Sequence, residues 1–373
     1  MNENNLKKLS KHGQSIWLDY IRRDMLENGT LKKMIEDDDV KGMTSNPSIF
    51  EMAIAESTIY DSEIHKLAHK KMDKMAIYEA ITQQDVQKAA DEFLTIYKNS
   101  KGHDGYVSLE VNPYLAHNTI GTVEEARRLW IAVDRPNVLI KVPATVEGLL
   151  AIRQLISEGI NVNVTLLFSL TRYKQVIEAY IAGLEDRVAQ GKSIHKIASV
   201  ASFFLSRIDA AVDPKESEFV AKGGEQALFA ENIRGLVAIS SAKVAYKLYK
   251  ELFDSEQFMK LVRQGAVPQR LLWASTKTKN PDYSDVKYVD ALIGRNTINT
   301  MPLETLEAFR DHGDPASRLD DHLEKAHFVL SELPDVGIDL TEITTKLEND
   351  GVEKFKVSFD KLLEAITEKI SHK

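Results

Sequence analysis

The sequence predicts an α/β protein whose eight parallel strands close into a (β/α)8 TIM barrel. Eight short apolar or β-branched runs recur along the 373 residues, and polar or turn residues and then a helical pattern follow them. Alternation of strand and helix is typical of parallel sheets, and eight such units match a closed barrel better than an open sheet. No glycine-rich phosphate fingerprint follows the first run, which argues against a doubly wound nucleotide-binding fold.

The expected strands are short runs rich in Val, Ile, Leu and aromatic residues, as half-buried or buried strands are. In chain order they cover residues 15–20, 42–46, 105–111, 137–143, 160–167, 197–204, 270–276 and 296–302. Amphipathic patterns between them predict helices over residues 122–133, 146–159 and 170–191. The last two of these end in glycine, as helices often do.

The chain is longer than a bare barrel of about 250 residues, and the surplus has two clear places. Residues 51–100 predict an all-helical insertion between the second and third strands, and residues 303–373 predict a helical tail. No Gly/Ser/Pro-rich linker and no internal repeat divides the chain. We therefore expect residues 1–373 to form a single barrel domain with helical additions.

Composition excludes several classes of function. The chain has no cysteine, so disulfides, thiolate nucleophiles and Cys-ligated zinc are excluded. A net charge of −8 argues against nucleic acid as a partner. The first residues lack the apolar segment of a signal peptide, and no apolar run approaches the ~18 residues that span a bilayer. We expect a cytoplasmic protein that does not contact membranes.

Lys141 is the most informative residue, because it is the only charged residue in the run NVLIKVP at 137–143. Side chains alternate along a strand. The aliphatic face formed by Val138, Ile140 and Val142 should meet the surrounding helices, so Lys141 should point into the barrel. By the same logic Glu110 on the third strand points inward, and a carboxylate faces the lysine.

Other strands repeat this pattern near their C-terminal ends, where barrel enzymes place their active sites. The inward polar or aromatic residues there are Asp19, Thr44, Asn46, Asn163, Thr165, Ser202, Phe204 and Ser275. Each has a structural alternative: Asn46 before Pro47 could be a helix N-cap, and Glu110 could be only an ion-pair partner for Lys141. The functional interpretation depends on several strands showing the pattern together.

A buried lysine suits covalent chemistry. Burial disfavours an ammonium group and thus favours the free amine, which attacks a carbonyl to form a Schiff base. Glu110 is the nearest inward carboxylate for moving protons, and Asp19 is the candidate base for C–C cleavage. Arg207 after the sixth strand, and Lys277 or Lys279 after the seventh, lie where barrel enzymes often bind phosphate.

Six stretches carry a family resemblance: TSNPSIF (44–50), SLEVNP (108–113), LIKVPAT (139–145), GINVNVTLLFS (159–169), SFFLSRID (202–209) and WASTKTKNP (273–281). Together they resemble the transaldolases, specifically the longer type within the class I Schiff-base aldolase superfamily. The resemblance implies reversible transfer of a dihydroxyacetone unit from a ketose phosphate, such as sedoheptulose 7-phosphate or fructose 6-phosphate, to an aldose phosphate in the pentose phosphate pathway. The acceptor would be glyceraldehyde 3-phosphate or erythrose 4-phosphate.

The resemblance also implies roles for single residues. Lys141 matches the family's Schiff-base lysine, Glu110 the glutamate that works through a bound water, and Thr165 the threonine that helps to hold that water. Asp19 matches the aspartate that moves the substrate hydroxyl proton. The remaining matches bind substrate: Asn46, Asn163 and Ser202 hold the dihydroxyacetone unit, Phe204 is an active-site aromatic, and Arg207 binds phosphate.

Two departures from the family pattern qualify these roles. Shorter transaldolases carry a second phosphate arginine where this chain has Lys277, so Lys277 or Lys279 could bind phosphate here. The first strand matches only through Asp19, and Asp24 is a weaker competitor for its role. No metal or other cofactor is expected, because a protonated imine is itself the electron sink. The pair His65 and His69 has the spacing of a helical metal site, but lysines lie beside it and no carboxylate lies between the two histidines, so we do not expect it to bind metal.

Three alternatives stay open at this stage. A fructose-6-phosphate-type aldolase would share the lysine, although that branch of the family is a much shorter barrel. A barrel glycosidase would use Glu110 and Asp19 as its carboxylate pair and would not need Lys141. A non-catalytic phosphosugar-binding barrel is the third. The chain could act as a monomer or as a homodimer.

Overall fold

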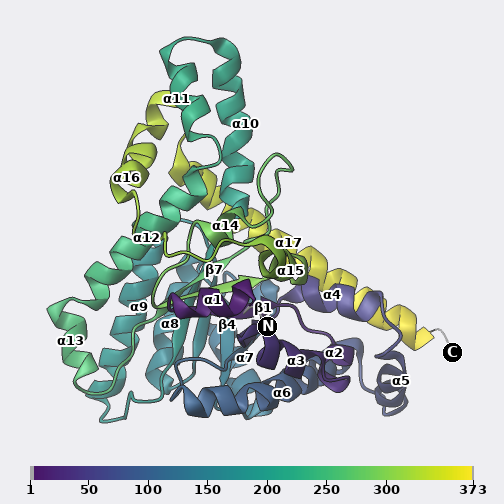
Figure 1. Ribbon diagram of the computed structural model, residues 1–373. Helices are drawn as coiled ribbons and strands as arrows, with labels where there is room; N and C mark the ends of the chain where they lie inside the picture. The colour runs from purple at the N-terminus through teal and green to yellow at the C-terminus, as the bar shows by residue number, and fades with distance from the viewer. Residues whose placement is uncertain (1–3, 372–373) are drawn as a thin grey trace.

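Eight parallel strands form a closed barrel, which confirms the predicted fold class (Figure 1). The computed structural model describes residues 4–371, apart from the side chains of residues 222, 225 and 226. Every strand pairs with its sequence neighbours, and β1 pairs with β8 to close the barrel. The strands are β1 (Gln14–Asp19), β2 (Val40–Thr44), β3 (Val107–Glu110), β4 (Val138–Pro143), β5 (Val162–Leu167), β6 (Ser199–Phe204), β7 (Arg270–Ala274) and β8 (Thr297–Met301). Each lies within one residue or two of its expected run.

The outer helices begin and end at residues suited to these positions. Asn118, Thr145 and Ser169 cap α7 (Thr119–Val133), α8 (Val146–Glu158) and α9 (Leu170–Ala189), and each side-chain oxygen accepts a hydrogen bond from a backbone N–H of the first turn. Gly159 ends α8 in the left-handed conformation at φ 95°, which a glycine adopts without steric cost. These caps are the local reason why the expected helices form where they do.

Three helices lie between β2 and β3: α4 (Pro47–Ala55), α5 (Asp61–His69) and α6 (Lys74–Asn99). The segment expected as an insertion, 51–100, thus contains α5, α6 and the last part of α4. The shorter elements α1 (Asn5–Lys11), α2 (Arg23–Glu27), α3 (Thr30–Asp38) and η1 (Pro113–Leu115) complete the first half of the chain. That the whole chain is one domain stays a prediction.

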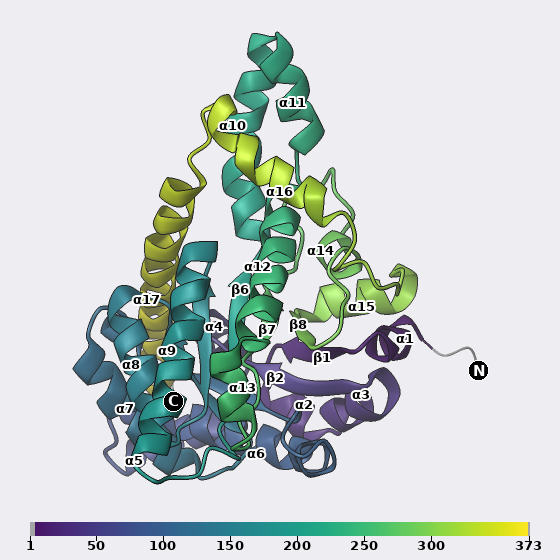
Figure 2. The same ribbon diagram turned by 90° about the vertical axis from the view of Figure 1, so that its left-hand side faces the viewer.

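The second half of the chain adds helices above and across the barrel. After β6 come α10 (Ser206–Lys222) and α11 (Glu225–Ile233), which project from the barrel in both views (Figures 1 and 2). They are followed by α12 (Val237–Phe253), α13 (Glu256–Val262) and α14 (Lys287–Asp290), and after β8 by α15 (Leu303–His312), α16 (Leu323–Glu332), η2 (Leu333–Val336) and α17 (Leu340–Ser371). The long α17 packs along α4 and continues past α5 (Figure 1). None of the helices in residues 4–371 combines the length and the hydrophobicity that a membrane span needs.

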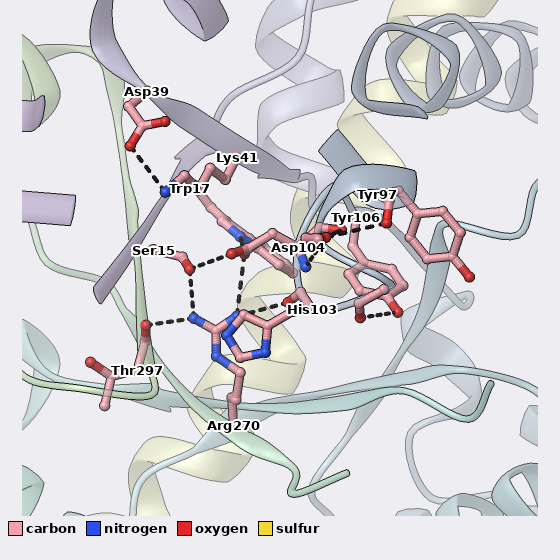
Figure 3. A network of polar contacts seen from close by, with 12 residues as sticks. Ser15, Trp17, Asp39, Lys41, Tyr97, His103, Asp104, Tyr106, Arg270 and Thr297 are labelled. Carbon is pink, nitrogen blue, oxygen red and sulfur yellow. Dashed lines mark hydrogen bonds and ion pairs between the residues drawn. The ribbon is translucent and has the colours of Figure 1, made fainter. Parts of the chain in front are cut away.

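A buried polar network closes the barrel at the N-terminal ends of its strands (Figure 3). Asp104 accepts hydrogen bonds from Ser15 Oγ at 2.7 Å and from Trp17 Nε1 at 3.1 Å. Arg270, the first residue of β7, forms an ion pair with Asp104 at 3.2 Å and donates to Thr297 O at 2.8 Å. This network fills the N-terminal end of the barrel, and the cavity described below lies at the opposite end.

Candidate active site

Lys141 and Glu110 form a buried pair inside the barrel. They are register partners on β4 and β3, and Lys141 Nζ donates to Glu110 Oε2 at 2.9 Å and to Ser45 O at 2.8 Å. The residues are 4% and 7% exposed. The inward direction expected for both side chains is therefore found, and the ammonium is held by hydrogen bonds to two oxygens.

Burial changes the acidity of the carboxyl group in this pair. It raises the pKa of Glu110, while the neighbouring charge of Lys141 and its hydrogen bond oppose that increase. A carboxyl group whose pKa lies above its ordinary range exchanges protons more readily near neutral pH, which suits a general acid–base role.

Asp19 is the second carboxylate of the site; it ends β1 and is partly exposed. Thr44 Oγ1 donates to Asp19 Oδ1 at 2.6 Å and lies 2.7 Å from Thr300 Oγ1. Burial raises the pKa of Asp19, and the charge of Lys141 opposes this increase. The competitor Asp24 lies instead in α2, where it is paired with Arg22 at 2.6 Å.

The inward residues of β5 and β6 extend the polar floor. Asn163 is fully buried; its Nδ2 donates to Ser108 Oγ at 2.9 Å and its Oδ1 accepts from Ser202 Oγ at 2.7 Å. Thr165 Oγ1, also buried, makes no hydrogen bond to any described protein group. The next residue, Leu166, has φ 55°, within an irregularity of the β5–β6 register. Such bulges occur beside active sites and change the direction of side chains.

Asn46 is a helix N-cap, as its structural interpretation predicted, and it also faces the site. Its side-chain oxygen accepts a hydrogen bond from Ile49 N at 3.1 Å and caps α4, with Pro47 at the first helical position. The same residue lines the cavity described below. The two interpretations of Asn46 are therefore compatible.

Positively charged side chains gather at the mouth of the barrel, beyond the C-terminal ends of the strands. The Arg207 guanidinium lies 5.3 Å from the centre of the Phe204 ring, and burial lowers its pKa while the Asp19 charge opposes that change. Lys277 forms an ion pair with Glu304. Lys279 forms no ion pair with a described carboxylate; partial burial lowers its pKa, and the charge of Arg207 lowers it further.

A cavity of about 540 Å³ connects the floor and the mouth at the C-terminal ends of the strands. Glu110 and Asn163 do not line it: they lie behind Lys141 and Ser202, to which they are hydrogen-bonded. Among the described residues no cluster of three or more side chains could hold a metal ion. The predicted residues that line the cavity are Asp19, Thr44, Asn46, Lys141, Thr165, Ser202, Phe204, Arg207, Ser275, Lys277 and Lys279.

Sequence reasoning missed several residues of this cavity. Thr300 comes from β8 and joins Thr44, while Lys354 and Phe355 come from α17. Thr300 could have been predicted as a site residue, because it is a polar residue near the C-terminal end of the eighth strand. For Lys354 the sequence carried no comparable signal, since a lysine in an amphipathic helix is ordinarily a solvated one.

Comparison with known sequences decides the family. The family model for transaldolase/fructose-6-phosphate aldolase matches residues 16–366, nearly the whole chain. The chain belongs to the transaldolase/fructose-6-phosphate aldolase family. The resemblance seen in the sequence is thus confirmed at the level of the family.

Members of this family with the name transaldolase match the chain over nearly its whole length. The transaldolase of Thiobacillus denitrificans is 48% identical over 360 residues, which are 96% of this chain and 99% of the relative. The transaldolase of Trichodesmium erythraeum is 46% identical over 371 residues, 98% of each chain. That of Mycobacterium bovis is 44% identical over 362 residues, covering 96% and 95%.

Proposed function

We propose that this transaldolase/fructose-6-phosphate aldolase family member is a transaldolase, a transferase that moves a dihydroxyacetone unit from a ketose phosphate to an aldose phosphate. The donor would be sedoheptulose 7-phosphate or fructose 6-phosphate, and the acceptor glyceraldehyde 3-phosphate or erythrose 4-phosphate. The relatives named transaldolase match over almost their full length. The observation that supports the chemistry most directly is the buried contact of Lys141 with Glu110 below a cavity whose mouth is cationic.

The first half of the reaction would form the imine. Glu110 accepts a proton from the Lys141 ammonium. The free amine then attacks the ketose carbonyl carbon, and the resulting carbinolamine loses water as Glu110 passes that proton to the departing oxygen. Glu110 lies behind the lysine rather than on the cavity wall, so this proton would pass through a water held with the help of the Thr165 hydroxyl, which has no described protein partner. The protonated imine then withdraws electrons from the bond to be broken.

The second half would break and remake a C–C bond. Asp19 takes the proton of the hydroxyl next to that bond, the bond breaks, and an aldose phosphate leaves while an enamine stays on Lys141. The enamine attacks the acceptor aldehyde, Asp19 returns its proton, and water releases the new ketose. The raised pKa of Asp19 makes it a stronger base for this step than an exposed aspartate.

The remaining cavity residues would bind the substrate at its two ends. Asn46 and Ser202 are placed to hold the dihydroxyacetone unit near Lys141, and Asn163 would act from behind Ser202. At the mouth Arg207 would bind the phosphate, and Lys279 is the better second cation because Glu304 already pairs with Lys277. Phe204 and Ser275 would complete the wall; Ser275 Oγ lies 2.9 Å from Ser206 Oγ.

Trapping with borohydride tests the covalent step. Incubation with fructose 6-phosphate and borohydride should reduce the imine and attach the three-carbon unit irreversibly to the peptide that contains Lys141. The Lys141→Met variant is the control and should stay unlabelled. Labelling on another lysine of the wild-type protein, or none, would refute the assignment.

A separate measurement distinguishes transfer from the aldolase alternative. Turnover of fructose 6-phosphate is followed with and without erythrose 4-phosphate. A transaldolase depends on the acceptor, whereas an aldolase releases free dihydroxyacetone without it.

We also propose that the protein acts in the cytoplasm, as a monomer or a homodimer. Light scattering after gel filtration measures the oligomeric state.

A further inference from the structure

The C-terminal helix α17 lies directly against the phosphate end of the cavity. A Cβ added to Gly351 would lie 2.9 Å from Leu166 Cδ2 and 3.6 Å from Arg207 Nη1. The backbone of α17 thus approaches the bulge of β5 and the guanidinium that follows β6. A residue three positions further along a helix shares the same face, and that residue is Lys354.

Lys354 lines the same cavity as Arg207 and Lys279, and so does its neighbour Phe355. Phe355 is buried and anchors this turn of the helix, while the lysine side chain is exposed at the rim. Lys354 therefore reaches the mouth from a segment far from the strands in sequence. Its position is set by the packing of α17 on the barrel.

The mouth holds more positive charge than the nearby carboxylates neutralise. Lys277 is paired with Glu304, and Lys356, two residues after Lys354 on α17, is paired with Glu353 at 2.7 Å. Arg207, Lys279 and Lys354 form no ion pair with any carboxylate in the described part of the chain. Their mutual repulsion is evident in Lys354, whose pKa the charge of Arg207 lowers, with partial burial adding to the effect.

Three unneutralised cations at one end of a cavity disfavour the empty site and favour a multiply charged anion. A phosphate ester carries about −1.5 to −2 charges near pH 7 and presents three acceptor oxygens. We propose that Lys354 is a further substrate-binding residue, which binds the phosphate group of the ketose or aldose phosphate together with Arg207 and Lys279. The identity of the ester depends on the proposed function; the affinity for a phosphate dianion does not.

Lys354 would thus set specificity for phosphorylated over free sugars from outside the barrel. Because the contact is remote from the bond that reacts, it adds binding energy without taking part in the chemistry. Since the lysine is exposed at the rim, the contribution should weaken as salt rises.

The test compares Lys354→Met with Lys356→Met, which removes the same charge two residues further along α17, on the opposite face of the helix. Binding of inorganic phosphate is measured by calorimetry, KM for fructose 6-phosphate by turnover, and imine formation by borohydride inactivation with dihydroxyacetone, which has no phosphate. Loss of one charge-assisted contact should weaken phosphate binding and raise KM about tenfold in Lys354→Met. The rate of inactivation should stay unchanged, and Lys354→Arg should restore KM.

The outcomes separate the two proposals. Equal phosphate affinity and equal KM in wild type and Lys354→Met would overturn the role of Lys354, whatever the trapping shows. Failure of fructose 6-phosphate with borohydride to label wild-type Lys141 would refute the imine mechanism, while the calorimetric comparison would still decide the phosphate site. An equal loss in Lys356→Met would show a general charge effect and would also overturn the assignment.

Discussion

Glu216 on α10 should make the protein less stable as pH rises. Its side chain is fully buried, and neither carboxylate oxygen has a hydrogen-bond partner among the described residues. Burial, with the charges of Asp213 and Asp209, raises the pKa of Glu216 to about 8 from 4.5, while Arg234 and Lys287 oppose the increase. The protonated form is therefore the one that the folded protein prefers.

The magnitude follows from linkage between protonation and folding. Each tenfold change in proton affinity corresponds to about 1.4 kcal/mol, so a pKa of about 8 rather than 4.5 corresponds to about 5 kcal/mol. Water admitted by local relaxation of α10 reduces this to about 2 to 4 kcal/mol. Because the folded-state pKa is raised, the stabilisation is complete below pH 4.5 and is lost as pH rises through 8.

The assay uses Glu216→Gln, which keeps the shape of the side chain and cannot ionise. The free energy of unfolding is measured in urea at pH values from 5 to 9. The variant should gain about 2 to 4 kcal/mol relative to wild type across this interval. Glu218→Gln, an exposed carboxylate on the same helix, is the control and should follow wild type. Parallel curves for wild type and Glu216→Gln would refute the reasoning.

Three further substitutions test the barrel itself. Glu110→Gln should lower kcat/KM about 10²- to 10⁴-fold in a coupled transaldolase assay, because the proton shuttle is lost; wild-type activity would contradict that role. Thr165→Val should lower kcat but change the free energy of unfolding by less than about 1 kcal/mol, because removal of the hydroxyl breaks no hydrogen bond to a described protein group. A large loss of stability would show that the hydroxyl has another partner. Asp104→Asn should destabilise by about 3 to 5 kcal/mol in thermal or urea unfolding, because Arg270 stays buried without its counter-charge; KM of the folded fraction should not change, and a raised KM would show coupling to the opposite end of the barrel.

The strands and their inward faces were predictable because strand periodicity is local. Val138, Ile140 and Val142 alternate with Lys141, so burial of one face determines where the lysine points. The same kind of signal placed all eight strands to within two residues of their observed bounds. The family stretches then added roles that no pattern of hydrophobicity contains.

The polar residues at the N-terminal end were not predicted, because their pairing is not local. Arg270 begins a strand and would ordinarily be exposed there, yet it is 6% exposed and paired with Asp104, 166 positions away in the chain. Lys354 escaped notice for the same reason: only the packing of α17 across the mouth brings it to Arg207. When two charged residues are distant in sequence, only the folded structure shows that they lie close together, and a single sequence does not contain that information.

The register of Glu110 opposite Lys141 has a consequence for laboratory evolution. The two groups lie on adjacent strands of a rigid ladder, whereas Arg207, Lys279 and Lys354 belong to helices and a loop around the rim. The proposed imine-forming pair and the proposed phosphate-binding residues therefore belong to different structural elements. A library that randomises the rim while leaving β3 and β4 untouched should yield catalysts with new donors and acceptors more often than one spread evenly over the chain.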